Sequence, residues 1–208
     1  MKYDAIIVAS GKGQRANLGY NKVFYKLKDG RSVLDCSIER FESDEDCQRI
    51  IVVTNPEYFH EVKGNKTITV EGGKERRDSV YNGLKTVESE YVLIHDGARP
   101  YLNTEALNEL KEKLKTDDCV VLGKIAVDTI KIIEDDEVVE TIDRNKVFMA
   151  ETPQGFRSSL IKDAYENCAD INFTDDCSLV ESLGYKVKIV IDRFDNRKLT
   201  KEEDFRNL

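Results

Sequence analysis

The stretch YDAIIVASGKGQRANLGYNK, from Tyr3 to Lys22, decides the fold expected for this chain. Its β-branched apolar run stops at the small residues of ASGKG, where a tight turn exposes several backbone N–H groups together. Such amides offer partial positive charge to an anion, and Arg15 and Lys22 add full positive charges in the same segment. We therefore expect a strand that leads into a loop able to bind a polyphosphate.

Two other phosphate-binding motifs fit this stretch less well. The GxGxxG dinucleotide motif needs a third glycine, and Ala16 stands at that position, which weakens the interpretation as an NAD-dependent oxidoreductase. A Walker A motif, GxxxxGK[ST], is absent from the sequence. A glycine-rich turn without a ligand is the remaining alternative. The absence of acidic residues between Lys12 and Lys22 favours phosphate binding over that alternative.

Length and composition limit the class of protein. With 208 residues, 40% hydrophobic and 35% charged, the chain can bury a substantial core, and we expect a single domain over residues 1–208. A net charge of −8 argues against a nucleic-acid partner. No apolar run approaches the roughly 20 residues of a membrane span, so we expect no membrane partner. Met1 leads almost directly into the first strand, which leaves no room for a signal peptide and predicts a cytoplasmic protein with reduced cysteines.

Buried strands alternate with amphipathic helices along most of the chain. Apolar strands are expected at 50–54, 67–70, 91–94, 119–122 and 186–191, and helices after Ser32, from Glu75, after Thr104, at 158–168 and at 175–183, with Thr200 capping a short terminal helix. This order predicts an α/β fold, in which a mostly parallel twisted sheet has helices on both faces.

The alternation stops between about residues 124 and 148. Two extended segments, 129–133 and 137–142, are joined there by an acidic turn. This hairpin is too polar to belong to the core. We therefore expect a protruding β-arm that contacts a partner subunit.

Four polar clusters follow buried strands or lie close to the end of one. They are Ser10 to Arg15, Gly72 to Ser79, Asp96 to Arg99, and the loop from Asp195 to Lys198. Ligands of open parallel sheets lie beyond the carboxyl ends of the strands, so these loops are expected to meet in one crevice. For each loop taken alone, the alternative is an ordinary solvent-exposed loop that binds no ligand.

Two charged residues near these loops have open roles. Asp96 stands where a carboxylate can bind Mg²⁺ against substrate phosphates, although a turn aspartate is the alternative. Arg144 either binds a phosphate of a second substrate or pairs with a neighbouring carboxylate. His95 is expected to be a core residue.

Six stretches of the sequence resemble the 2-C-methyl-D-erythritol 4-phosphate cytidylyltransferase family of the non-mevalonate isoprenoid pathway. They are ASGKGQR with Lys22, GGKERRDSV, LIHDGARP, AVDTIK, DRNKVFMAETPQGF, and FTDDCSLVESLG with DNRKLT, and the match runs in order from residue 3 to about 205. The resemblance implies a Rossmann-like nucleotidyltransferase domain, CTP as co-substrate with Mg²⁺, and a homodimer formed through the β-arm.

The resemblance also implies roles for individual residues. The loop of Ala9, Ser10, Gly11 and Gly13, with Gly73 and Ser79, is similar to the elements that bind the nucleotide. Arg15, Lys22 and Lys198 are similar to the catalytic cations around the triphosphate, and Asp96 to the residue near metal and ribose. Thr129, Arg144, Thr152, Thr174 and Asp175 are similar to residues that bind the methylerythritol phosphate, partly across the dimer.

Some positions depart from the family pattern, and two other functions are alternatives. Ser10, Ala16 and the Asn21-Lys22-Val23 segment differ from the usual residues, and the last change affects how Lys22 is positioned. A ribitol-5-phosphate cytidylyltransferase has the same chemistry, but the segments around Asp96 and Arg144 look more like the methylerythritol family. A non-catalytic nucleotide-binding dimer is the alternative from another class, and the retained basic residues speak against it.

Overall fold

The computed structural model describes residues 1–11, 19–167 and 173–206. Its main sheet has seven strands in the order β3-β2-β1-β4-β8-β5-β9, and β6 and β7 form a separate two-stranded sheet. The strands are β1 (Tyr3–Val8), β2 (Cys47–Thr54), β3 (Thr67–Glu71), β4 (Tyr91–Asp96), β5 (Cys119–Ile125), β6 (Ile130–Glu134), β7 (Glu137–Ile142), β8 (Phe148–Arg157) and β9 (Lys188–Ile191). In the main sheet only β8 is antiparallel to its neighbours. The predicted mostly parallel sheet is therefore confirmed.

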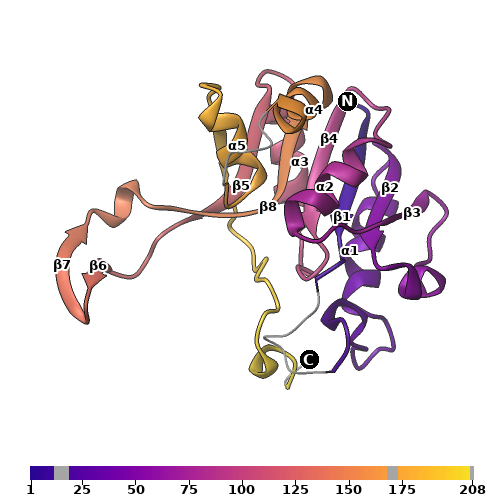
Figure 1. Cartoon of the computed structure of the whole chain (residues 1–208), viewed down its shortest axis with the longest axis horizontal. Coiled ribbons are helices and arrows are strands. Elements are labelled where there is room, and N and C mark those ends of the chain that lie inside the picture. Colours follow the sequence, from indigo (N-terminus) through magenta and orange to yellow (C-terminus); the bar gives the residue numbers. More distant parts are fainter. Residues whose placement is uncertain (12–18, 168–172, 207–208) are drawn as a thin grey trace.

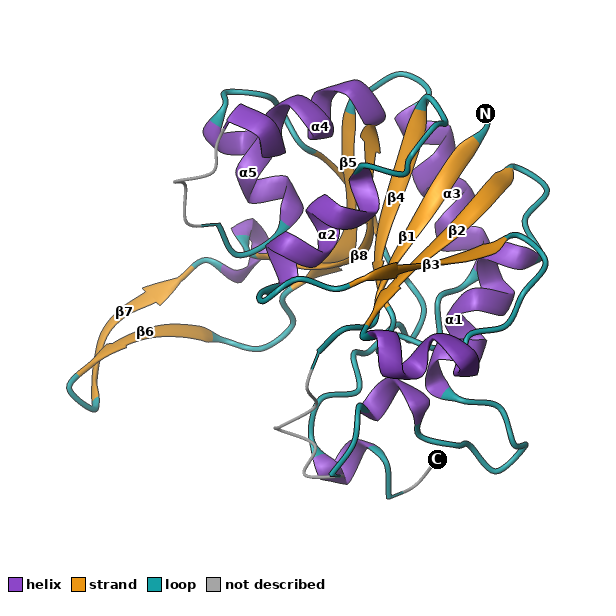
Figure 2. Cartoon of the chain, turned by 45° about the vertical axis from the view of Figure 1, so that its right-hand side comes forward, coloured by secondary structure: helices purple, strands orange, loops and turns teal. Residues whose placement is uncertain are grey.

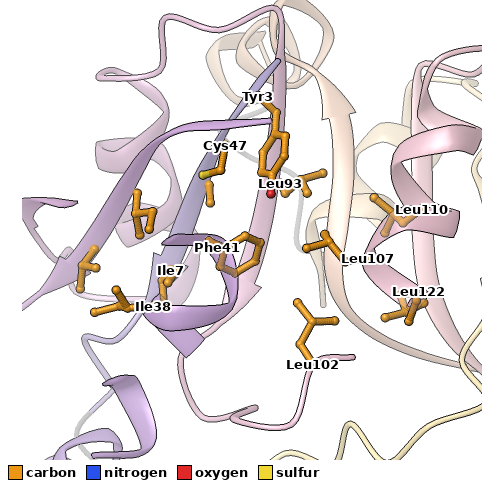
Figure 3. Packing of buried hydrophobic residues seen from close by; sticks show 14 of the residues in the cluster. Tyr3, Ile7, Ile38, Phe41, Cys47, Leu93, Leu102, Leu107, Leu110 and Leu122 are labelled. Atoms are coloured by element: carbon orange, nitrogen blue, oxygen red, sulfur yellow. The ribbon is translucent and has the colours of Figure 1, made fainter. Parts of the chain in front are cut away.

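Helices cover both faces of the sheet, as Figure 2 shows. They are α1 (Val33–Glu42), α2 (Arg76–Leu84), α3 (Thr104–Leu114), α4 (Ser158–Asn167) and α5 (Asp176–Ser182). Side chains on a strand alternate between faces, so Ile7 of β1 packs with α1 and α3, whereas Ile6 packs with α2, α4 and α5. Figure 3 shows the first of these two cores, in which Phe41 of α1 and Leu107 of α3 meet the sheet. Among the described residues, none of the helices combines the length and the apolar character that a membrane span requires.

The hairpin of β6 and β7 projects away from the main sheet (Figure 1). Its turn residues, Asp135 and Asp136, both have positive φ, as a two-residue turn of type I′ requires. Aspartate tolerates this conformation better than most residues other than glycine. The β-arm, defined from here on as residues 124–148, thus contains the hairpin that the sequence predicts.

Strand β8 was not predicted as a strand of the main sheet. The prediction missed it because Pro153 and Gly155 interrupt its pattern, and proline normally argues against a central strand. The structure accommodates Pro153 at an irregularity, where the pairing of β5 with β8 shifts register between Val121 and Gly123. Two predicted caps were also wrong: Asn103 rather than Thr104 caps α3, and the terminal 3₁₀ turn begins after Lys201 rather than Thr200.

Candidate active site

A pocket of about 770 Å³ opens at the carboxyl edge of β1 and β4. Seven residues with predicted site roles line it together: Ala9, Ser10, Gly11, Lys22, Gly73, Asp96 and Lys198. They come from four loops that are far apart in the sequence. Parallel strands bring their carboxyl ends to one edge, which explains why these loops meet. Arg15 and Gly13, which were assigned to the same loop, lie outside the described residues.

The loop after β1 and the bend before α2 approach each other very closely. A Cβ atom on Gly72 would lie 2.4 Å from the Cβ of Ser10, so only glycine fits there. The hydroxyls of Ser10 and Ser79 are 2.8 Å apart, and the Gly73 N–H donates to Ser79 Oγ at 3.0 Å. Ser79 is fully buried and donates to the Glu75 carbonyl. Ser79 therefore fixes the shape of the pocket wall that Ser10 and Gly73 line.

Lys22 is held by the backbone around it. Its Nζ donates to the Leu199 carbonyl at 2.6 Å, which connects this lysine to the segment that contains Lys198. The preceding Asn21 is buried, and its side-chain amide donates to the Ala9 carbonyl at 2.5 Å while its oxygen accepts from Val23 N–H at 3.3 Å. Asn21 thus ties the Lys22 turn to the end of β1, although this segment departs from the family pattern.

Asp96, the last residue of β4, is surrounded by cations. Lys198 Nζ lies 2.7 Å from its Oδ2, and Arg76 Nε lies 3.4 Å from its Oδ1. Arg99 Nε is 3.8 Å from Oδ2. Burial alone would raise the pKa of Asp96, but the charges of Lys198 and Arg76 outweigh burial and hold that pKa below its ordinary value. Asp96 is therefore a carboxylate at every physiological pH.

Thr152 and His95 fix Asp96 from inside the protein. The Asp96 N–H donates to Thr152 Oγ1 at 3.0 Å, which leaves the Thr152 hydroxyl to donate to His95 Nδ1 at 3.2 Å. His95 Nε2 then donates to the Arg99 carbonyl at 3.1 Å. Burial lowers the pKa of His95 to about 4, so the ring is neutral. Thr152 was predicted to bind substrate, but in this structure its hydroxyl supports the backbone of Asp96 and it does not line the pocket.

The other residues predicted to bind the acceptor lie away from the pocket of their own chain. Thr129 and Arg144 are exposed on the β-arm, where Arg144 Nη1 donates to the Val127 carbonyl at 2.6 Å. Thr174 is exposed before α5. Asp175 caps α5 by accepting from the Ser178 N–H, and its other oxygen accepts from Gln154 at 2.6 Å.

Sequence reasoning assigned no role to several residues that complete the site. Arg76 and Lys74 line the pocket beside Gly73, and Arg99 joins Asp96 to the Asn196 carbonyl at 2.7 Å. Asn196 is fully buried and donates to the Thr152 carbonyl at 2.9 Å. Arg76 follows a glycine-rich bend and opens a helix, a position that the sequence pattern already marks.

A cationic, glycine-lined pocket at the carboxyl edge of this sheet defines a nucleotide-binding protein of the Rossmann-like α/β class. A family model described as 2-C-methyl-D-erythritol 4-phosphate cytidylyltransferase matches residues 3–207. The chain belongs to this family, as the resemblance predicted.

Relatives with this description cover nearly the whole chain. The protein of Clostridioides difficile is 41% identical over 214 residues, covering 97% of this chain and 90% of its own length. That of Geobacillus thermodenitrificans is 40% identical over 215 residues, with 98% and 94% covered. The crystal structure of the Francisella tularensis enzyme superposes with a TM-score of 0.86 at 27% identity, covering 100% of this chain and 98% of that one. An Anaerococcus prevotii structure gives 0.85 at 32% identity, covering 98% and 92%. The comparisons give no support to the ribitol or non-catalytic alternatives.

Proposed function

We propose that the chain transfers CMP from CTP to 2-C-methyl-D-erythritol 4-phosphate, a step of isoprenoid biosynthesis. The products are 4-diphosphocytidyl-2-C-methyl-D-erythritol and pyrophosphate. One observation carries the proposal most directly: Lys22, Lys198 and Asp96 line a single pocket with the Ser10 and Gly73 loops. These groups suit a reaction between two phosphorylated substrates, and the family to which the chain belongs has this activity in its description.

The chemistry needs cations more than a general base. An oxygen of the acceptor phosphate attacks the α-phosphorus of CTP, and the bond from that phosphorus to the leaving pyrophosphate breaks. A phosphate monoester with a second pKa of ~6 is already largely ionised at neutral pH. Bringing two like charges to ~4 Å costs on the order of 4 kcal/mol at an effective dielectric of about 20. The positive charges of Lys22, Lys198 and the predicted Arg15 offset this repulsion. They also stabilise the negative charge that develops on the leaving pyrophosphate.

The pocket also fits a magnesium ion that arrives with the nucleotide. Mg²⁺ is commonly held by one or two carboxylates together with substrate phosphates and water. Asp96 supplies one ionised carboxylate in the pocket, and no cluster of three or more acidic, histidine or cysteine ligands occurs among the residues that the structure describes. We propose that Asp96 binds Mg²⁺, which supplies charge neutralisation at the phosphates.

The β-arm suits a contact with a second copy of the chain. It exposes apolar side chains, with Ile133 64% and Val138 60% accessible, and a two-stranded hairpin is marginally stable alone. Thr129 and Arg144 stand on this arm and do not line the pocket of their own chain. We propose a homodimer in which the arm brings Thr129 and Arg144 to the acceptor site of the partner, which Thr174 and Asp175 border.

The substrate and the thiols support a proposal for the cellular compartment. CTP is an intracellular nucleotide, and the described Cys36, Cys47, Cys119 and Cys177 are all free, as is usual in a reducing compartment. We propose that the protein acts in the cytoplasm.

Pyrophosphate release from CTP tests this function. The purified protein is supplied with Mg²⁺ and either 2-C-methyl-D-erythritol 4-phosphate or ribitol 5-phosphate, with a parallel sample in which a chelator removes the metal. Release with the first acceptor only, and its loss on chelation, is the expected result. Release with ribitol 5-phosphate would overturn the acceptor assignment, and no release with either would favour a non-catalytic nucleotide-binding protein.

A further inference from the structure

A buried carboxylate outside the pocket holds one of the cations inside it. Asp176, the first residue of α5, is fully buried and does not line the pocket. Its Oδ2 accepts from Arg76 Nη2 at 2.8 Å, and its Oδ1 accepts from the Tyr165 hydroxyl at 2.6 Å. Arg76 stands one hundred residues earlier, at the start of α2.

Arg76 spans the distance between two carboxylates. While Nη2 is bound to Asp176, its Nε lies 3.4 Å from Asp96 Oδ1. The opposite oxygen of Asp96 is 2.7 Å from Lys198 Nζ. Each oxygen of Asp96 therefore faces a different cation. The cation at Oδ1 is Arg76, which is held by a residue of α5 that lies outside the pocket.

The protonation states support this arrangement. Burial alone would lower the pKa of Arg76, but the charges of Asp176 and Asp96 outweigh burial and raise that pKa, so the guanidinium stays charged. Burial and the charge of Asp176 raise the pKa of Tyr165, so its hydroxyl remains a donor. Both oxygens of Asp176 are thus matched with donors.

The stability of the fold alone gives little reason for the buried ion pair of Arg76 with Asp176. Replacing a buried ion pair by well-packed apolar residues is often neutral or stabilising, because the desolvation cost offsets the attraction. What the pair does provide is a fixed direction for the guanidinium, since a planar fork bound at one nitrogen has few ways to turn.

We propose that Asp176 is a positioning residue for the reaction: it anchors Arg76, which in turn holds Asp96 in the orientation that leaves Lys198 directed at the substrate phosphates. Without this anchor, Arg76 is free to form a two-pronged pair with Asp96. Asp96 then turns toward Arg76 and loses its contact with Lys198. The inference rests on the cytidylyltransferase activity proposed above.

Kinetics of three variants test the inference. Asp176→Asn keeps the side-chain size and removes the charge that holds Arg76. Arg76→Gln removes the other partner, and Arg76→Lys keeps a positive charge that cannot reach Asp176 and Asp96 together. Asp4→Asn is the matched control. Asp4 is also a fully buried carboxylate paired with an arginine, Arg49 at 2.9 Å, but it lies near the amino-terminal end of β1, away from the pocket at the carboxyl ends.

The expected result separates turnover from binding. Asp176→Asn and Arg76→Lys should each lower kcat about tenfold while changing the Kd for CTP less than threefold, and Asp176→Asn combined with Arg76→Gln should be no slower than Arg76→Gln alone. Asp4→Asn should lower the melting temperature and leave kcat unchanged.

Three outcomes would overturn the inference. They are wild-type kcat in folded Asp176→Asn, wild-type kcat in Arg76→Lys, and losses that multiply in the double variant, since a merely structural role gives independent losses. If Asp176→Asn does not fold, Arg76→Lys decides. A wild-type protein that turns over no substrate would refute the proposed function instead, so the two failures are distinguishable.

Discussion

Lys198→Ala should lower turnover far more than it weakens CTP binding. Lys198 Nζ lies 2.7 Å from Asp96 and lines the pocket in which we propose that the two anionic substrates meet. The repulsion between two like charges at ~4 Å is up to about 4 kcal/mol at an effective dielectric near 20, and a lysine between the substrates can offset it. The Lys198 side chain is 36% exposed, so water screens part of this energy. We therefore expect a loss of about 2–3 kcal/mol from the transition state, or a kcat roughly 30- to 160-fold lower.

The assay measures pyrophosphate release at saturating substrates, and calorimetry measures CTP affinity separately. Lys201→Ala is the control, because Lys201 is a nearby lysine whose side chain is 72% exposed and which does not line the pocket. It should behave as the wild type does. Equal losses in kcat and CTP affinity for Lys198→Ala would refute the reasoning, because much of the interaction would then already be made in the ground state. A weakened CTP affinity with an unchanged kcat would also refute it, because that result means that Lys198 stabilises the ground state and the transition state equally.

Three further predictions concern other parts of the chain. Arg144→Ala should raise the KM for the acceptor about tenfold or more, whereas Lys146→Ala should not; an unchanged KM would remove Arg144 from the acceptor site. Val138→Glu should convert the proposed dimer to a monomer in sedimentation experiments, and a persistent dimer would exclude this face of the β-arm as the dimer contact. Burial alone would raise the pKa of Asp4, but hydrogen bonds from Arg49 and the 88–89 backbone lower it, so its stabilisation is present above pH ~4 and lost as pH falls. The stability difference between the wild type and Asp4→Asn should accordingly be about 1–3 kcal/mol at pH 7 and shrink below pH ~4; a constant difference would contradict this.

The sequence predicts the frame of the fold and the place of the pocket for the same reason. Continuous apolar runs such as 50–54 and 91–94 are typical of strands buried on both faces, and such strands are parallel. Their carboxyl ends must then share one edge. The meeting of Ser10, Gly73 and Asp96 follows from that geometry without any knowledge of side-chain contacts.

Features that depend on long-range pairing could not be predicted in this way. Strand β8 inserts between β4 and β5. Pro153 makes its sequence look unlike a central strand, and the register irregularity that accommodates this proline arises only in the folded sheet. The partnership of Arg76 with Asp176 joins residues one hundred positions apart, and nothing local to either residue indicates it.

Local competition explains the remaining differences. Asn103 and Thr104 are both residues that commonly cap helices. Asn103 is the N-cap of α3 because its Oδ1 accepts from the Glu105 N–H at 2.7 Å. The Thr152 hydroxyl accepts from the Asp96 N–H and lies next to His95, contacts across two strands that no local pattern indicates, while its role at the acceptor site stays a prediction.

Phosphorus NMR of the reaction mixture tests the central claim most directly, because it observes the new bond. With CTP, Mg²⁺ and 2-C-methyl-D-erythritol 4-phosphate, we expect the triphosphate and monoester signals to give way to a diphosphate diester and pyrophosphate in equal amounts. CMP together with pyrophosphate would mean that water rather than the acceptor attacks. An unchanged spectrum would contradict the assignment of this pocket as a cytidylyltransferase site.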